Sequence, residues 1–101
     1  MATVASLRLT EYEIKAIKTA FTDIFGEGEI ILFGSRVDPD ARGGDIDLYL
    51  IPQNRENLRN KRINFLIKLD LLIGERKVDV IVAKDQNRPI EKEALLTGVT
   101  L

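Results

Sequence analysis

The chain has 101 residues, of which 45% are hydrophobic and 31% charged, and its net charge is −1. This composition is typical of a globular protein and argues against both a disordered and a membrane-spanning one. The length is that of a small domain, so we expect one domain over residues 1–101. No apolar run approaches the roughly 20 residues of a membrane helix, and acidic residues precede any signal-peptide core. We therefore expect a cytoplasmic location and no membrane partner.

The chain contains neither cysteine nor histidine. This excludes disulfides, thiolate metal sites, the usual zinc ligand and the usual general base. Any catalysis must use carboxylates, lysines, hydroxyls or a bound metal. The slightly negative net charge does not favour nucleic acid, so no direct DNA binding is expected, although a local basic patch could provide it.

The N-terminal part predicts a helix followed by a buried strand. Thr10 and Glu13 have the spacing of a capping box, and the helix ends at Gly26 and Gly28. Its apolar face consists of Ile14, Ile17, Phe21 and Ile24. In residues 29–33, Glu29 is followed by four apolar residues, and Gly34-Ser35 comes directly after them. This pattern predicts a buried strand that ends in a tight turn.

Residues 36–44 contain Pro39 and two adjacent glycines, which indicates a loop. Four further elements are predicted after it. They are a strand over 45–51 that ends at Pro52, a helix from near Asn54 to Ile73, a strand over 77–83 and a short helix from Pro89 to Leu96. The apolar positions of the long helix include Leu58, Phe65, Leu66, Leu69 and Ile73.

The lengths of the connections predict the sheet. The loop between the first two strands is too short for a crossover helix, so these strands should be antiparallel neighbours. The long helix over 54–73 suits a crossover to a parallel third strand. The fold class is therefore α/β, in the mixed α+β sense: a small mixed sheet packed with helices.

Three aspartates are the candidate catalytic and metal-binding residues. Side chains alternate along a strand, so Asp45 and Asp47 should point to one face, about 6.6 Å apart along the backbone. A divalent cation between them relieves their repulsion, and magnesium prefers such oxygen ligands. Asp79 lies in an otherwise apolar strand and supplies a third carboxylate if that strand pairs beside the second. Three such carboxylates suit two metal ions about 3.5–4 Å apart.

The turn after the first strand predicts a phosphate site. Gly34 allows a close approach of the backbone, and the amides near Ser35 can donate to phosphate oxygens. Arg36 and Arg42 can neutralise a triphosphate.

Each feature also has an ordinary structural interpretation. An Asp-x-Asp pair alone is usually a solvated face, a Gly-Ser pair is common in turns, and Asp79 could form an ion pair with Lys77 or an arginine. Loop arginines such as Arg36 and Arg42 most often serve only to keep the surface soluble. The basic residues near the start of the long helix, Arg55, Arg59, Lys61 and Arg62, more often form a solvated face than a nucleic-acid site. The order and spacing of the features together favour a site that binds metal ions and phosphates.

The segments FGSR, residues 33–36, and ARGGDIDLYL, residues 41–50, resemble a known family. They are similar to the minimal nucleotidyltransferases of the DNA polymerase beta superfamily, the antitoxin-like partners of HEPN-domain proteins in prokaryotes. The resemblance covers nearly the whole chain. It implies that Gly34 and Ser35 hold the nucleotide phosphates, that Asp45 and Asp47 bind metal, and that Asp79 assists deprotonation of the attacking hydroxyl.

The resemblance further implies transfer of AMP from ATP, with magnesium as cofactor, to a tyrosine hydroxyl of a HEPN-type toxin. This protein adenylylation would neutralise the toxin. We expect a hetero-oligomer with that partner, with a homodimer as the second arrangement. One alternative is a non-catalytic antitoxin that inhibits its partner by occlusion. Another is nucleotidyl transfer to a small molecule or an RNA end, for which so short a chain leaves little room to hold the acceptor.

Overall fold

The computed structural model describes residues 9–33, 46–74 and 77–101. Its helices are α1 (Glu11–Phe25), α2 (Leu58–Ile73) and α3 (Pro89–Thr97), and its strands are β1 (Gly28–Phe33), β2 (Ile46–Pro52), β3 (Val78–Val82) and β4 (Val99–Thr100). Among these residues, no helix has both the length and the apolar character needed to cross a membrane.

The strands form one mixed sheet in the order β3-β2-β1-β4. β1 is antiparallel to both β2 and β4, whereas β2 and β3 are parallel and connected through α2. The predicted antiparallel and parallel pairs are therefore confirmed, as is the α/β class. The two-residue strand β4 was not predicted, because only its pairing with Ile31 and Leu32 makes it a strand.

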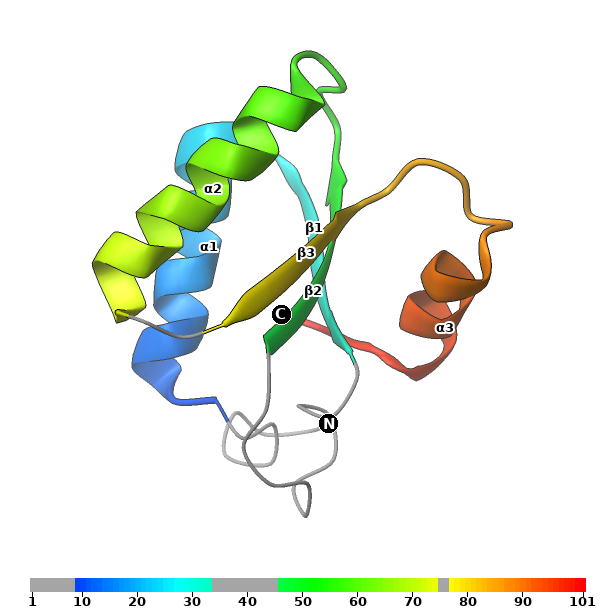
Figure 1. Cartoon of the computed structure of the whole chain (residues 1–101). Helices are drawn as coiled ribbons and strands as arrows, with labels where there is room; N and C mark the ends of the chain where they lie inside the picture. The colour runs from blue at the N-terminus through cyan, green and yellow to red at the C-terminus, as the bar shows by residue number, and fades with distance from the viewer. Residues whose placement is uncertain (1–8, 34–45, 75–76) are drawn as a thin grey trace.

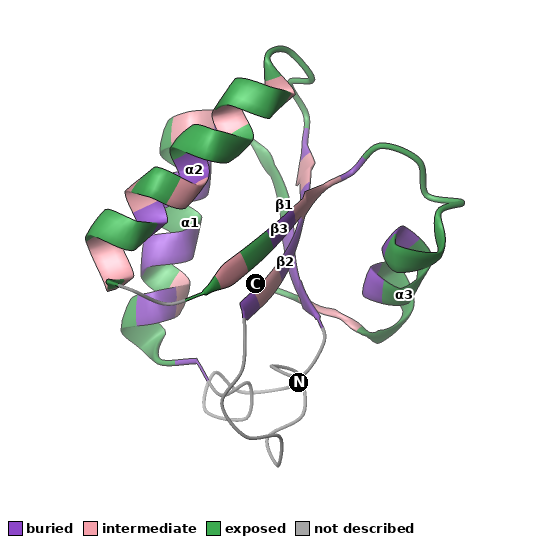
Figure 2. Cartoon of the chain, in the orientation of Figure 1, coloured by how far each residue is buried: buried purple, intermediate pink, exposed green. Residues whose placement is uncertain are grey.

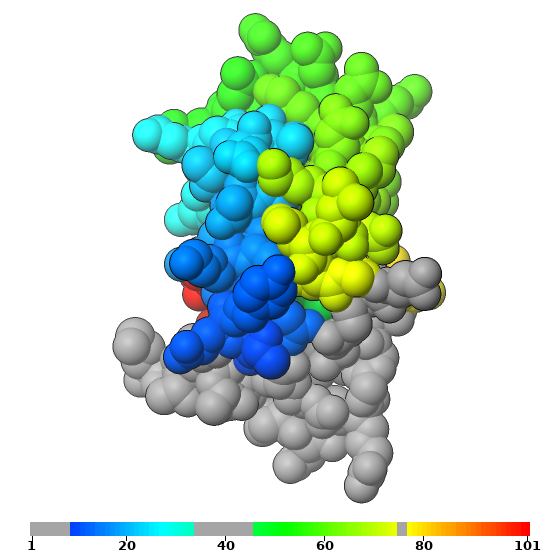
Figure 3. All heavy atoms as spheres, turned by 90° about the vertical axis from the view of Figure 1, so that its left-hand side faces the viewer, coloured from blue at the N-terminus to red at the C-terminus, as the bar shows by residue number. Residues whose placement is uncertain are grey.

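Helices cover both faces of this sheet (Figure 1). On one face α1 and α2 lie side by side, as Figure 3 shows from that side. Phe25 of α1 packs edge-on against Phe65 of α2, with ring centroids 5.9 Å apart, above the inward residues Leu48 and Leu50 of β2. The opposite face carries Ile31, Phe33, Tyr49 and Ala83 with Ala94 of α3. Figure 2 shows that the buried residues concentrate along the central strands and the inner sides of the helices.

The start of α1 follows from the predicted capping box. The Glu13 N–H donates to the Thr10 hydroxyl at 3.0 Å, and the Thr10 N–H donates to the Glu13 carboxylate at 2.9 Å. Gly26 caps the other end of the helix, as expected, at φ +82°. Gly28, predicted as a second helix stop, is instead the first residue of β1.

The predicted start of the long helix near Asn54 was wrong, because α2 begins at Leu58. The Asn54 side chain accepts the N–H of Glu56 at 2.8 Å, which favours a turn over a helix. Asn57 then adopts a left-handed conformation, with φ 52° and ψ 37°. Arg55 consequently precedes the helix rather than extending its early face.

The other boundaries differ from the predictions by one or two residues. β2 includes Pro52, which pairs with Gly28, and β3 is shorter than the predicted 77–83 segment. α3 continues to Thr97, one residue beyond the predicted end, and has Pro89 in its first turn as expected.

Candidate active site

Asp47 and Asp79 lie directly opposite each other on neighbouring strands. The parallel register of β2 and β3 pairs Asp47 with Asp79. Two residues farther along both strands, it pairs Tyr49 with Ile81. Neighbouring strands are about 4.8 Å apart, and residues in register point to the same face, so the two carboxylates share one surface. Farther along the two strands, α3 covers this same face of the sheet. The predicted side-by-side placement of these two aspartates is therefore present.

The surroundings of the two aspartates differ. Asp47 is half-buried on β2, which has a hydrogen-bonded neighbour on both sides. It also pairs with Phe33, the last residue of β1. Asp79 is exposed on β3, one of the two edge strands of the described sheet. One carboxylate is thus held in the interior of the sheet while the other is accessible from its edge.

The remaining predicted site residues lie outside the described residues. They are Gly34, Ser35, Arg36, Arg42 and Asp45. In the chain, Gly34 directly follows Phe33, and Asp45 directly precedes Ile46 of β2. Their roles in phosphate and metal binding stay predictions.

The Asp47–Asp79 pair is chemically suited to a divalent cation. Magnesium binds hard oxygen ligands and usually takes one or two carboxylates, with water or phosphate oxygens completing its shell. Two aspartates on adjacent strands satisfy that requirement. Within residues 9–33, 46–74 and 77–101, no cluster reaches three potential ligands, and the third predicted one, Asp45, is not among those residues.

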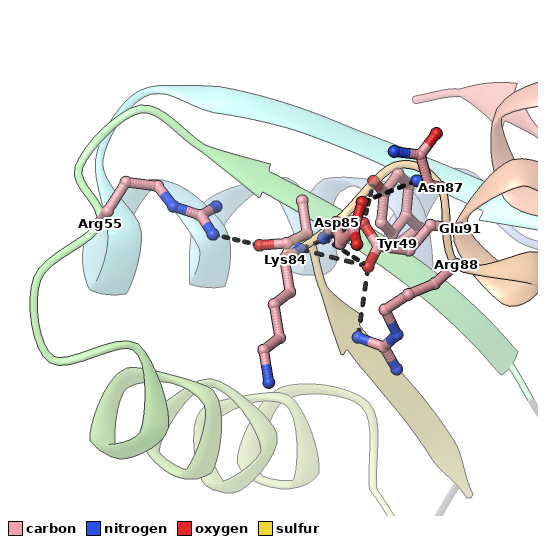
Figure 4. A network of polar contacts seen from close by, with 8 residues as sticks. Tyr49, Arg55, Lys84, Asp85, Asn87, Arg88 and Glu91 are labelled. Atoms are coloured by element: carbon pink, nitrogen blue, oxygen red, sulfur yellow. Dashed lines mark hydrogen bonds and ion pairs between the residues drawn. The ribbon is translucent and has the colours of Figure 1, made fainter.

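A buried polar network lies on the same face, two residues farther along β2 (Figure 4). The Tyr49 hydroxyl donates to the Glu91 carboxylate at 2.7 Å, and both side chains are fully buried. Glu91 also accepts the backbone N–H of Asp85 at 2.9 Å and of Lys84 at 3.1 Å, and the Arg88 guanidinium at 3.2 Å. This network joins α3 and the segment before it to the central strand.

The network shifts the acidity of both its buried groups. Burial raises the pKa of Tyr49 to about 12, and the hydrogen bond to Glu91 adds to this rise. Burial alone would raise the pKa of Glu91, but the hydrogen bonds from the Asp85 N–H and from Tyr49 outweigh it and leave the pKa below its usual value. Tyr49 is therefore a neutral donor and Glu91 a charged acceptor at neutral pH.

Basic residues form a cleft beside β3. Its volume is about 610 Å³, and its charged lining residues are Arg55, Arg59, Arg62, Lys84 and Arg88. The Arg62 Nε donates to the Val80 carbonyl at 3.0 Å, and Arg55 donates to the Ala83 carbonyl. Arg55, Arg59 and Arg62 belong to the basic group predicted near the start of the long helix. Lys84 and Arg88 were not predicted, because nothing in the neighbouring sequence indicates that they line the same cleft as that group.

The family comparison agrees with this arrangement. Residues 9–101 match the family described as polymerase beta, nucleotidyltransferase. A comparison with curated proteins gave no match. The match spans every element of the structure, including the strands that carry Asp47 and Asp79. The chain therefore belongs to the polymerase beta nucleotidyltransferase family, as its motifs indicated, and its family activity is nucleotidyl transfer.

Proposed function

We propose that this chain is a magnesium-dependent nucleotidyltransferase that transfers AMP from ATP to a tyrosine hydroxyl of a HEPN-type toxin and so acts as its antitoxin. The observation that carries the proposal is the register of β2 and β3, which sets Asp47 opposite Asp79 on one face of the sheet. The sequence predicts that Asp45 and the Gly34-Ser35 turn complete this site.

Asp47 and Asp79, with Asp45, are the residues that would hold magnesium. Bound there, the metal supplies positive charge to the reacting phosphate and lowers the pKa of an oxygen attached to it. The Gly34 and Ser35 amides would hold the phosphates, and Arg36 and Arg42 would neutralise the triphosphate.

The transfer exchanges one phosphorus–oxygen bond for another. The tyrosine oxygen attacks the α-phosphorus of ATP and forms the new bond, while the bond from that phosphorus to the bridging oxygen breaks and pyrophosphate leaves. The phenolic proton passes to the Asp79 carboxylate. Asp79 suits this task because it is exposed on the edge strand, where a side chain of another protein can reach it.

Transfer of labelled AMP from ATP to a co-expressed HEPN-type partner tests the proposal. We expect Asp47→Asn with Asp79→Asn to reduce transfer by about a hundredfold or more, since it removes the carboxylates that would hold magnesium and accept the phenolic proton. Asp70→Asn, a change of the same type at an exposed position of α2, should leave the rate unchanged. Chelation of divalent ions should abolish transfer and added magnesium restore it. Equal rates for the wild type and the double variant would refute the assignment.

A binding-only antitoxin is the second candidate, and one observation favours it. Ile63, Ile67 and Leu71 follow one another at one-turn spacing on α2 and are 48%, 55% and 80% exposed. Large apolar side chains exposed in such a row are typical of a surface that a partner covers. The same double variant separates the two functions: full inhibition of the toxin by Asp47→Asn with Asp79→Asn, without AMP transfer, would establish occlusion.

A further inference from the structure

The cleft beside β3 combines a cationic rim with an apolar floor. Among the described residues, its charged lining consists of Arg55, Arg59, Arg62, Lys84 and Arg88. The floor is formed by Leu58 at the start of α2 and by Val80, Ile81 and Val82 of the edge strand. Because the whole chain has a net charge of −1, these cations are a local concentration of positive charge rather than part of a basic protein. Such a lining is chemically suited to a ligand that carries both anionic and apolar groups.

Three of the cations are held in place by contacts within the chain. Arg62 and Arg55 each donate to a backbone carbonyl of the β3 segment, and Arg88 donates to the buried Glu91. A guanidinium has five N–H donors, so each retains several for a ligand. Lys84 extends in the direction of α2 (Figure 4), into the same cleft. The three arginines, held by these hydrogen bonds, lose little conformational entropy when a ligand binds.

The cleft lies along the same strand as Asp79. Val80, the first strand residue that lines it, directly follows Asp79. At about 3.3 Å per residue, the floor over Val80 to Val82 extends from roughly 3 to 10 Å beyond Asp79 along β3. A chain bound in the cleft would therefore lead to the exposed carboxylate at the sheet edge.

We propose that this cleft docks an acidic segment of the acceptor protein, with carboxylates on the cationic rim and apolar side chains on the floor, next to the tyrosine that receives AMP. The proposal rests on the proposed function, because it assigns the acceptor of that same reaction. Carboxylates pair well with arginine through paired hydrogen bonds. This docking surface determines which tyrosine of the acceptor protein receives AMP.

A nucleic-acid ligand fits the cleft less well. Single strands bind where bases stack on aromatic side chains, and none of the described residues that line this cleft is aromatic. The apolar floor has no counterpart in a phosphodiester backbone. The net charge of −1 also provides no long-range attraction for a polyanion.

The test is a binding measurement on the full chain without nucleotide. The probes are a short fluorescein-labelled peptide with a tyrosine among glutamate and leucine residues, and a labelled single-stranded RNA of equal charge. We expect Arg59→Glu with Lys84→Glu to weaken peptide binding about tenfold or more, since each reversal turns attraction into repulsion. Both residues are exposed, and glutamate in the first turn of α2 is favoured by the helix dipole, so the fold should persist.

Lys15→Glu, a reversal at an exposed position of α1 outside the cleft, should leave peptide binding unchanged. Arg59→Gln with Lys84→Gln, which removes the charges without reversing them, should give an intermediate loss. Three results would overturn the docking proposal: no binding of the peptide, binding that the cleft variants do not weaken, or tighter binding of the RNA that the same variants abolish. Because no nucleotide is present, peptide binding with no AMP transfer would refute the proposed activity alone.

Discussion

Replacing Glu91 tests whether the buried network holds α3 on the sheet. The Glu91 carboxylate is fully buried and accepts hydrogen bonds from Tyr49, Lys84, Asp85 and Arg88. Glu91→Ala removes all of these at once and leaves a space beside Tyr49. The prediction concerns the free energy of unfolding rather than the chemistry, since Glu91 is no part of the candidate active site.

The cost follows from what each donor loses. A buried donor left without an acceptor costs about 1–3 kcal/mol, and the fully buried Tyr49 hydroxyl should be near the upper value. Lys84 and Asp85 are exposed residues, so their N–H groups can bind water in part and cost less. We therefore expect Glu91→Ala to lower the free energy of unfolding by about 3–5 kcal/mol, a large part of the 5–15 kcal/mol typical of a domain.

Urea unfolding followed by circular dichroism measures this change. Tyr49→Phe is the matched comparison, because it removes one hydrogen bond and leaves the other donors to Glu91 in place, at a cost of about 1 kcal/mol. Glu93→Ala, on the exposed side of α3, should stay within about 0.5 kcal/mol of the wild type. A Glu91→Ala protein no less stable than Tyr49→Phe would refute the claim that the carboxylate organises the network.

Two further predictions concern pH and capping. Burial raises the pKa of Tyr49 from 10.0 to about 12, so between these values the unfolded chain has lost the proton that the folded chain keeps. The resulting stability is complete below pH 10 and is lost as pH rises towards 12. Urea midpoints should fall more steeply there in the wild type than in Tyr49→Phe, and parallel curves would contradict the shift. Thr10→Ala removes the acceptor of the Glu13 N–H and should cost about 0.5–2 kcal/mol, whereas an unchanged thermal midpoint would show that the cap contributes nothing.

Local patterns were sufficient to predict most of the fold and the placement of two of the three candidate aspartates. The capping box at Thr10 and Glu13 fixed the start of α1, because both partners are three residues apart in the chain. Alternation along a strand, with a helix long enough for a crossover, placed Asp47 and Asp79 on one face of neighbouring strands. These features depend on short-range geometry and on a connection rule with few exceptions.

Features that depend on tertiary contacts could not be read from the sequence. Glutamate in the first turn of a helix is usually an exposed capping residue, and nothing near Glu91 in the chain indicates that Tyr49, 42 residues earlier, buries it. The cleft likewise joins Arg55 and Arg59 to Lys84 and Arg88 only after β3 has folded back beside β2. The basic residues looked like a solvated helix face because only one wall of the cleft is local.

Because β3 lies at an edge of the sheet and β2 inside it, Asp79 and Asp47 have different roles in the proposed reaction. Asp47, on a strand paired on both sides, is held by the hydrogen bonds of β1 and β3 and is suited to the nucleotide and metal half of the chemistry. Asp79 has the sheet on one side only, and the cationic cleft begins at the residue that follows it. An acceptor that approaches the edge therefore meets the cleft and Asp79 together. If the docking proposal is correct, reversing cleft charges should raise the KM for the acceptor and leave the KM for ATP unchanged, because the residues expected to hold ATP, Gly34, Ser35, Arg36 and Arg42, are not among those that line the cleft.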